Sequence, residues 1–123
     1  MARILLAEDD SSLRHFLAKS LEAAGHEVIA FGDGEDALPV LDAGPFDILI
    51  SDVVMPNVGG IELAVKAKAS LPNLPVIFIT GFSAVAVEMS EQGQAGNQVL
   101  SKPFHLSTLV EAVDRALDTK AAS

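Results

Sequence analysis

Short runs of branched apolar residues alternate along the chain with longer segments in which apolar residues recur every three or four positions. The runs are Ile4–Ala7, Val28–Phe31, Ile48–Ile50, Val76–Ile79 and the weaker Val99–Leu100. Apolar runs of this kind, bounded by turn residues, are typical of buried β-strands. We therefore expect five strands.

The segments between these runs have the periodicity of amphipathic helices. Their apolar residues are Leu13, Phe16, Leu17, Leu21 and Ala24 in the first helix, Ile61, Leu63, Ala64, Ala67 and Leu71 in the second, and Leu106, Leu109, Val110, Val113 and Leu117 in the third. Each set is expected to form one buried helix face. Ser11 or Ser12 can cap the first helix, and Gly25 can end it. Weaker helices are expected at 34–42 and 83–91.

Strands and helices follow one another in strict alternation. This order favours a parallel sheet covered by helices on both faces, and five strands fit an open, doubly wound α/β fold. The length of 123 residues suits one domain. We expect this domain to comprise residues 1–119, followed by a flexible C-terminal tail at 120–123.

The composition narrows the possible functions. The chain has 50% hydrophobic residues, no cysteine and a net charge of −9. We expect no nucleic-acid partner, because binding to phosphates requires a basic surface. No apolar run approaches the roughly 20 residues that span a bilayer and no signal peptide is evident, so we expect a cytoplasmic protein without a membrane partner. Residues 1–62 hold twelve acidic and three basic residues, either as a solvated surface or as part of a site.

Polar residues follow four of the predicted strands. The acidic triplet 8–10 follows the first strand, Asp52 the third, Thr80 the fourth and Lys102 the fifth. The carboxyl ends of parallel strands form one edge of a sheet, where ligands of such folds bind. Each residue alone has a structural explanation, as Asp10 does at a helix N-terminus. Their convergence on one edge indicates a site.

This edge has the chemistry of a phosphoryl-transfer site. Clustered carboxylates repel one another, and a hard divalent cation such as Mg²⁺ relieves the repulsion through oxygen ligands. An Asp carboxylate can then attack phosphorus and form an aspartyl-phosphate. Thr80 and Lys102 are suited to hold the remaining phosphoryl oxygens. Direct binding of a flavin or nucleotide phosphate is disfavoured, because it requires a Gly-rich loop after the first strand.

Four motifs occur in order along the chain. They are Ile4–Asp10, Asp47–Pro56 with Gly60 following, Phe78–Gly81, and Lys102–Phe104. Together they resemble the response-regulator receiver domain of two-component systems, and the resemblance covers the chain from Arg3 to about Asp118. It implies a flavodoxin-like (βα)5 fold, with a five-stranded parallel sheet of strand order 2-1-3-4-5.

The resemblance implies a role for each acidic residue. Asp52 would be the phosphoacceptor and also a metal ligand. Asp9 would bind Mg²⁺ directly, Glu8 would bind it through a water molecule, and Val54 would bind it through its backbone carbonyl. The resemblance also implies that Mn²⁺ would be able to take the place of Mg²⁺. The position of Arg14 in the first helix selects Glu8 and Asp9 as the acidic pair of the family.

The resemblance also assigns the phosphoryl-binding groups. Thr80 would be the switch hydroxyl, and Lys102 would be the phosphoryl-binding lysine, followed by a cis peptide bond to Pro103. The chain departs from the family at Val99, where an aromatic residue, Thr or His is usual, and it contains no tyrosine. A tyrosine switch is therefore excluded.

A receiver that ends after its last helix is expected to act through protein contacts that depend on phosphorylation. The stretches 78–82 and 99–105 resemble the CpdR group of stand-alone receivers, whose unphosphorylated form primes a cytoplasmic Clp protease in cell-cycle regulation. The resemblance implies a sensor histidine kinase or a histidine phosphotransfer protein as the phosphodonor. It implies a Clp ATPase as the output partner.

Other functions stay open at this point. A phosphorelay intermediate and a regulator of a motor or an enzyme use the same kind of domain. An aspartyl-phosphate hydrolase requires a second Asp two residues after the nucleophile, where Val54 stands. We therefore expect a signalling protein rather than an enzyme. A scaffold without phosphoryl chemistry would not require the acidic residues, Thr80 and Lys102.

Overall fold

The computed structural model describes residues 2–41, 44–55, 57–81 and 97–122. The elements in this part of the chain are β1 (Arg3–Ala7), α1 (Ser11–Ala23), β2 (Glu27–Phe31), α2 (Gly34–Leu41), β3 (Ile48–Asp52), α3 (Gly60–Ser70), β4 (Val76–Thr80), β5 (Asn97–Ser101) and α5 (Leu106–Ala122). They agree with the alternation that the apolar pattern predicts. The helix expected at 83–91 lies outside the described residues.

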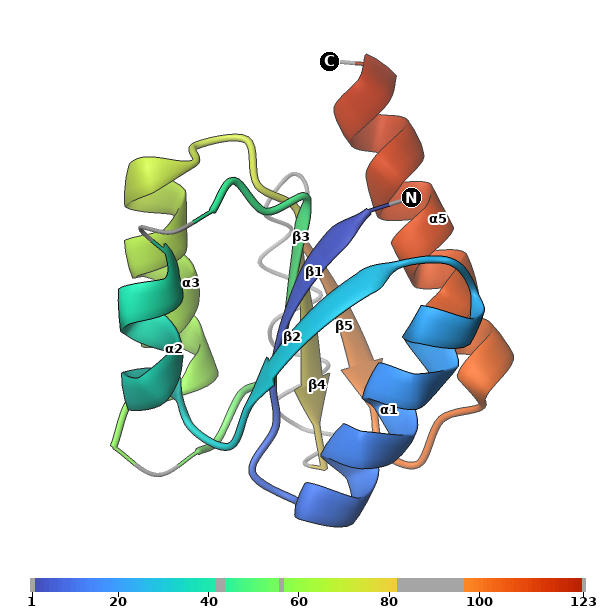
Figure 1. Cartoon of the computed structure of the whole chain (residues 1–123), viewed down its shortest axis with the longest axis horizontal. Coiled ribbons are helices and arrows are strands. Elements are labelled where there is room, and N and C mark those ends of the chain that lie inside the picture. The colour runs from blue at the N-terminus through green and yellow to red at the C-terminus, as the bar shows by residue number, and fades with distance from the viewer. Residues whose placement is uncertain (1, 42–43, 56, 82–96, 123) are drawn as a thin grey trace.

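The strands form one parallel sheet in the order β2-β1-β3-β4-β5 (Figure 1). Strand β1 pairs with β2 on one side and with β3 on the other, so that Leu6 lies between Ala30 and Ile50. This order confirms the predicted doubly wound α/β fold with flavodoxin-like topology. Strand β5 is longer than its apolar core, Val99–Leu100, predicts.

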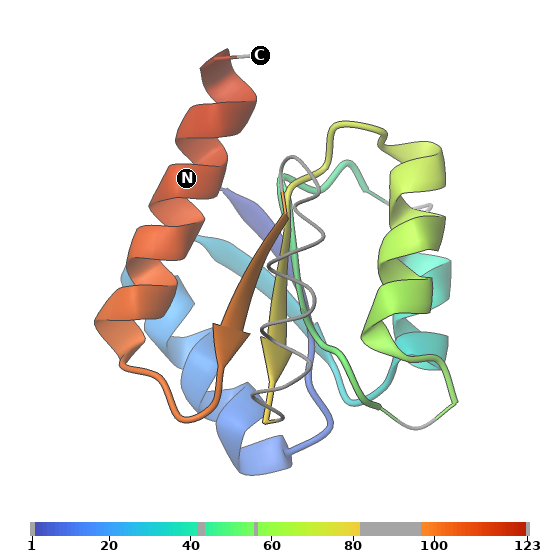
Figure 2. The same ribbon diagram turned by 180° about the vertical axis from the view of Figure 1, so that it is seen from behind.

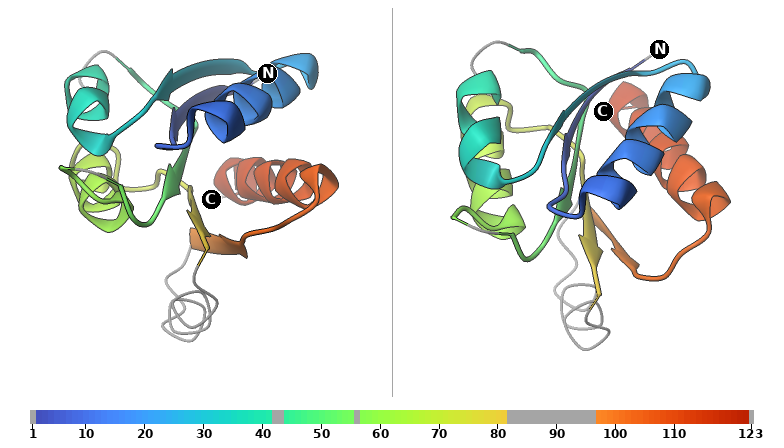
Figure 3. Two further views of the ribbon diagram at one scale, coloured as in Figure 1. Left: turned by 90° about the horizontal axis from the view of Figure 1, so that it is seen from below. Right: turned by 60° about the horizontal axis from the view of Figure 1, so that its bottom comes forward.

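Helices cover both faces of the sheet, with α1 and α5 on one face and α2 and α3 on the other (Figure 1). Figure 2 shows the same layers from behind, and Figure 3 shows the sheet between them from below. Successive side chains of a strand point to opposite faces. Ile4 and Leu6 therefore pack in the cluster that contains residues of α1 and α5, whereas Leu5 and Ala7 pack in the cluster that contains residues of α2 and α3. Both clusters are buried, which explains why the strand runs are continuously apolar.

Helix α1 begins at an acidic cap. The side chain of Asp10 accepts hydrogen bonds from the backbone N–H groups of Ser12 and Leu13, at 3.0 and 3.1 Å. The N-cap is therefore Asp10, which confirms the helix N-terminal place expected for this residue, whereas the alternative that Ser11 or Ser12 caps the helix is wrong. Gly25 follows the helix with φ of 97°, a left-handed conformation that glycine adopts without steric cost, so the predicted end is confirmed.

Two large residues expected in the core lie on the surface. Phe16 of α1 is 53% exposed and Ile61 of α3 is 51% exposed, whereas their neighbours Leu17 and Leu63 are buried. Ala24 is also exposed. A helix that packs on a sheet buries a strip narrower than the stripe marked by helical spacing, so residues at the edge of the stripe face solvent. The other residues of the three predicted faces are buried or partly buried.

Helices α2 and α5 end at Leu41 and Ala122. Helix α2 runs to Leu41 and contains Pro39. Helix α5 runs to Ala122, so the described backbone at 120–122 continues the helix into the stretch for which we expected a tail. Among the described residues, no helix is both long enough and apolar enough to cross a membrane.

Candidate functional site

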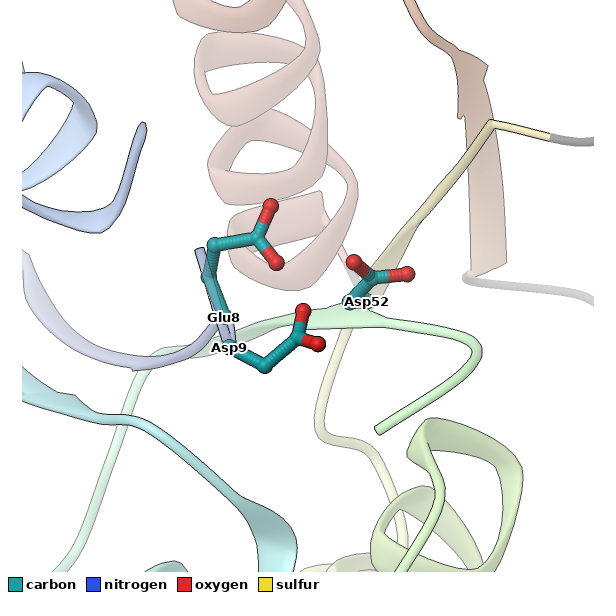
Figure 4. Close-up of side chains that lie close together, drawn as sticks. All are labelled: Glu8, Asp9 and Asp52. Atoms are coloured by element: carbon teal, nitrogen blue, oxygen red, sulfur yellow. The ribbon is translucent and has the colours of Figure 1, made fainter. Parts of the chain in front are cut away.

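Three carboxylates meet at the carboxyl end of the sheet. Glu8 and Asp9 follow β1, and Asp52 ends the neighbouring strand β3. One carboxylate oxygen from each residue lies within 4.8 Å of the other two, and Figure 4 shows the three side chains converging from these two strand ends. Glu8 is 0% exposed and Asp52 is buried, whereas Asp9 is exposed. The cluster is therefore closed behind Glu8 and open to solvent at Asp9.

Lys102 brings a positive charge to this cluster. Its Nζ atom donates hydrogen bonds to Glu8 Oε1 at 2.8 Å and to Asp52 Oδ2 at 3.0 Å. Its backbone N–H donates to the carbonyl oxygen of Thr80 at 2.7 Å, which ties the residue to the end of β4. The peptide bond between Lys102 and Pro103 is cis, as predicted. The predicted convergence of acidic and basic residues from separate strand ends is thus observed.

Burial and charge change the protonation of the site. Burial of the Glu8 carboxyl, together with the neighbouring Asp52, raises the pKa of Glu8 to about 7, and Lys102 opposes this rise. Burial also disfavours the charged form of Lys102, but its contacts with Glu8 and Asp52 outweigh burial and raise the pKa of the lysine. Lys102 therefore stays charged at neutral pH, while Glu8 exchanges its proton close to neutrality.

The acidic cluster fits a hard divalent cation. Mg²⁺ prefers oxygen ligands, and protein sites usually hold it by one or two carboxylates and several water molecules. The cluster offers three carboxylates, one of them exposed. Glu8 Oε2 is buried and has no hydrogen-bond partner in the described structure. Buried polar atoms normally have partners, so this oxygen is suited to accept a hydrogen bond from a metal-bound water.

Thr80 lies next to Asp52 in the strand register, and Val54 lies two residues after Asp52 along the chain. Thr80 is buried at the end of β4, and the register pairs Asp52 with Ile79, so Thr80 is one residue further along the neighbouring strand. The backbone N–H of Val54 donates to Asp52 Oδ1 at 3.3 Å, and the Val54 side chain is exposed. The metal-binding role of the Val54 carbonyl stays a prediction.

Two further residues shape the site through contacts that the sequence analysis did not predict. Gly60 begins α3, and a Cβ atom there would overlap the carbonyl oxygen of Asp52, so the helix can approach β3 this closely only with glycine. Arg14 Nη1 donates a hydrogen bond to the carbonyl oxygen of Glu8 at 2.9 Å. No spacing rule signals either contact, although Gly60 belongs to one of the recognised motifs.

An apolar hollow of about 250 Å³ lies beside the lysine, between α1 and the loop that precedes α5. It is lined by Leu13, Phe16, Leu17, Lys102, Pro103, Phe104 and Leu106. The exposed ring of Phe16 forms part of its wall. An apolar surface therefore adjoins the charged cluster at Lys102.

Residues 4–114 match the family described as the response regulator receiver domain. The chain belongs to this family. It is 48% identical over 117 residues to the response regulator receiver protein CpdR of Brucella abortus (strain 2308), an alignment that covers 95% of this chain and 98% of CpdR. Other relatives are longer. The receiver is 42% identical over 116 residues to FleR of Pseudomonas aeruginosa, and it spans 24% of the length of that protein.

Solved structures of receiver domains have the same fold. The receiver domain of the hybrid histidine kinase CckA is 38% identical, with a TM-score of 0.80, over 94% of this chain and 98% of that domain. TrrA of Thermotoga maritima, solved in complex with Mg²⁺ and BeF, is 28% identical, with a TM-score of 0.82, over 95% of this chain and 100% of TrrA. Receiver domains bind Mg²⁺ at an acidic site and are phosphorylated by histidine kinases. The predicted family and fold are confirmed, and the roles of individual residues stay predictions.

Proposed function

We propose that this receiver is a Mg²⁺-dependent phosphoacceptor of a phosphorelay, with Asp52 as the acceptor. The observation that carries the proposal is the pair of hydrogen bonds from Lys102 to Glu8 and Asp52, at 2.8 and 3.0 Å. Glu8 is wholly buried. Of the two carboxylates that the lysine contacts, Asp52 is therefore the one that a phosphoryl group can approach.

The proposed reaction moves a phosphoryl group from a histidine to Asp52. A carboxylate oxygen of Asp52 attacks phosphorus, the P–N bond to the histidine breaks, and the imidazole keeps the bonding electron pair and takes a proton from solvent. Negative charge on the phosphoryl oxygens is held by Lys102 and by the hydroxyl of Thr80. The raised pKa of Lys102 supports this role, because it keeps the ammonium group charged.

The acidic residues divide the proposed metal site between them. Asp9, Asp52 and the backbone carbonyl of Val54 would hold the ion directly, and Glu8 would hold one of its water molecules. A bound ion would offset the charge of the crowded carboxylates and of the phosphoryl oxygens. Mn²⁺ is expected to substitute for Mg²⁺, because it also accepts carboxylate, carbonyl and water oxygens. The unpartnered Oε2 of Glu8 supports the role of this residue.

Phosphorylation by a small acyl phosphate tests the acceptor. Wild type, Asp52→Asn and Asp10→Asn are incubated with the donor, with and without Mg²⁺, and their intact masses are measured. We expect wild type and Asp10→Asn to gain one phosphoryl group in the presence of Mg²⁺, and Asp52→Asn to gain none. Asp10→Asn is a matched control, because Asn caps helices as well as Asp does.

The other outcomes of this experiment separate the alternatives. Repeated consumption of the donor without a stable adduct would indicate an aspartyl-phosphate hydrolase. No reaction at all would indicate a scaffold. A single adduct would support a signalling protein that catalyses only its own phosphoryl transfer and dephosphorylation.

We also propose that the phosphodonor is a sensor histidine kinase or a histidine phosphotransfer protein, and that the output partner is a cytoplasmic Clp ATPase. The support is the 48% identity to CpdR over 98% of the length of that protein. A pull-down with a purified Clp ATPase, using wild type with and without the phosphodonor and Asp52→Asn, tests the partner. Binding that phosphorylation abolishes in wild type supports the proposal. Absent binding, or binding that phosphorylation does not change, would favour a phosphorelay intermediate or a regulator of a motor or another enzyme.

A further inference from the structure

Both backbone groups of Glu8 are hydrogen-bonded, one in the peptide unit before this residue and one in the peptide unit that joins it to Asp9. The backbone N–H of Glu8 donates to the carbonyl oxygen of Phe31 at 3.0 Å, at the end of β2. The carbonyl oxygen of Glu8 accepts a hydrogen bond from Arg14 Nη1 at 2.9 Å. The backbone at the start of the acidic pair, Glu8 and Asp9, is therefore restrained, because both backbone groups of Glu8 are hydrogen-bonded.

The backbone beside Arg14 leaves room for its guanidinium group. A Cβ atom at Gly32, in the loop after β2, would lie 3.0 Å from Arg14 Nη1 and 3.6 Å from Arg14 Cζ. The first distance is shorter than an ordinary van der Waals contact, so any side chain at this position would press on the guanidinium. Arg14 is half-buried, and its guanidinium group contacts the carbonyl of Glu8 after β1 and lies close to Gly32 after β2.

The carbonyl of Glu8 and the amide nitrogen of Asp9 belong to one planar peptide unit. A hydrogen bond that fixes the direction of the carbonyl therefore also fixes the direction in which the chain enters Asp9. Asp9 is exposed, so the packing of its own side chain cannot provide the same restraint. The hydrogen bond from Arg14 therefore restrains the backbone at Asp9, and it does so through the Glu8 carbonyl rather than through a carboxylate of the cluster.

We propose that Arg14 is a positioning residue for the metal site, and that Gly32 serves the site by leaving space for it. The proposal rests on the proposed function, in which Asp9 and Glu8 bind Mg²⁺. Groups that orient metal ligands from the outer shell often matter for affinity almost as much as the ligands do. In this site the oriented element is a backbone peptide rather than a ligand side chain.

A simple effect of charge predicts the opposite result. Arg14 adds a positive charge close to the acidic cluster, so its removal should strengthen the binding of a dication if charge alone mattered. Loss of positioning should weaken that binding. The sign of the change therefore separates the two explanations.

The experiment measures the Mg²⁺ dissociation constant of the full chain by titration calorimetry, at a temperature where every variant is folded. The variants are Arg14→Met, Gly32→Ala, their double variant and Lys19→Met. We expect Arg14→Met to bind Mg²⁺ about tenfold more weakly than wild type, as for other outer-shell groups. Gly32→Ala keeps the charge and should weaken binding by a smaller factor, because it displaces the guanidinium without removing it.

The double variant shows whether Gly32 acts through Arg14. With the guanidinium removed, an added Cβ at position 32 has nothing to displace, so the double variant should bind Mg²⁺ as Arg14→Met does. Lys19→Met is the matched control, because it removes one positive charge from the same helix at an exposed residue that pairs with Glu22. We expect its dissociation constant to be close to that of wild type.

Unfolding midpoints without Mg²⁺ are measured in parallel, because a purely structural role would lower the midpoint and leave the dissociation constant unchanged. That result would overturn the proposal. Unchanged or tighter Mg²⁺ binding by Arg14→Met would also overturn it. So would a double variant in which Gly32→Ala weakens Mg²⁺ binding by the same factor as it does when Arg14 is present. Failure of the proposed function looks different, because wild type itself would then not bind Mg²⁺.

Discussion

The Nζ atom of Lys102 lies 2.8 Å from Oε1 of Glu8, although 94 residues separate the two along the chain. Glu8 is wholly buried, and its second carboxylate oxygen has no hydrogen-bond partner in the described structure. One lysine therefore faces two carboxylates, Glu8 and Asp52. The uncompensated negative charge makes the site sensitive to protons as well as to cations.

The stability of the metal-free protein should depend on the protonation of Glu8. Burial and Asp52 raise the pKa of Glu8 from 4.5 to about 7 in the folded chain. The folded state therefore binds this proton more tightly than the unfolded state. The resulting stabilisation is fully present below about pH 4.5 and is lost as the pH rises through about 7. The difference corresponds to at most about 3 kcal/mol in the free energy of unfolding.

Urea unfolding between pH 5 and 8 measures this dependence, with Glu8→Gln as the matched variant. We expect wild type to lose stability across this range and Glu8→Gln to lose less, because the amide has no proton to release. Equal slopes for the two proteins would contradict the assignment to Glu8. Addition of Mg²⁺ should flatten the slope of wild type, because the ion stabilises the ionised form.

Asp52→Asn should stabilise the metal-free protein. The substitution removes one of the crowded charges and leaves Lys102 paired with Glu8. We expect a gain of about 1 kcal/mol, which corresponds to a rise of roughly 4 °C in the unfolding midpoint of a domain of this size. Mg²⁺ should raise the midpoint of wild type by mass action and should have a smaller effect on Asp52→Asn. Thermal unfolding with and without the ion measures both effects, and equal midpoints without Mg²⁺ would contradict the prediction.

Thr80→Ala should uncouple partner binding from phosphorylation while Asp52 still accepts a phosphoryl group. The reason is that the hydroxyl of Thr80 can form a charge-assisted hydrogen bond with the new phosphoryl oxygens, and alanine cannot. Thr80→Ser keeps the hydroxyl and is the matched control. Partner affinity with and without phosphodonor measures the coupling.

Val99 provides the contrasting position for this test. Its side chain packs against the cluster of α2 and α3, and Val99→Ala should cost about 1 kcal/mol of stability with little effect on coupling. Loss of switching in Val99→Ala with switching retained in Thr80→Ala would show that the signal follows β5 rather than the hydroxyl.

Phe16→Ala should slow phosphoryl transfer from a phosphohistidine protein more than transfer from a small acyl phosphate. The Phe16 ring is exposed in the wall of the hollow next to Lys102, where a protein donor that delivers a phosphoryl group to Asp52 can rest. A small donor needs no such contact. Val65→Ala is the matched control, because Val65 is 66% exposed on α3, on the other face of the sheet. Equal slowing with both donors would show instead that Phe16 supports the site itself.

The fold could be predicted from the sequence because the strands are buried on both faces of the sheet. Continuous apolar runs such as Ile4–Ala7 can only be covered by helices from two sides, and that requirement leads to a parallel sheet. Helical spacing was less informative about burial. Phe16 and Ile61 fit the spacing of their helices yet are exposed, because periodicity marks a stripe and only the tertiary packing decides how much of it is covered.

The parts of the site that follow strand ends could be predicted from the sequence. The contacts that a long side chain makes with a distant loop could not. Asp52 and Lys102 could be placed together because each follows a strand of the same sheet. The contact of Arg14 with the Glu8 carbonyl depends on a side chain that crosses between loops past Gly32, and no sequence spacing encodes such a path. The cap of α1 shows a third case. Asp10 and Ser11 are both good caps, and only the path of the backbone selects one of them.

The two hydrophobic clusters share no residue in the described part of the chain, and the sheet lies between them as a partition. A repacking of the layer formed by α1 and α5 therefore has no direct route to the layer formed by α2 and α3. The partition ends at the carboxyl edge of the sheet. There the side chain of Lys102 contacts Glu8, which follows β1, and Asp52, which ends β3. Glu8 and Asp52 come two residues after Leu6 and Ile50, which pack with α1 and α5, so a change of charge at this edge acts first on that layer.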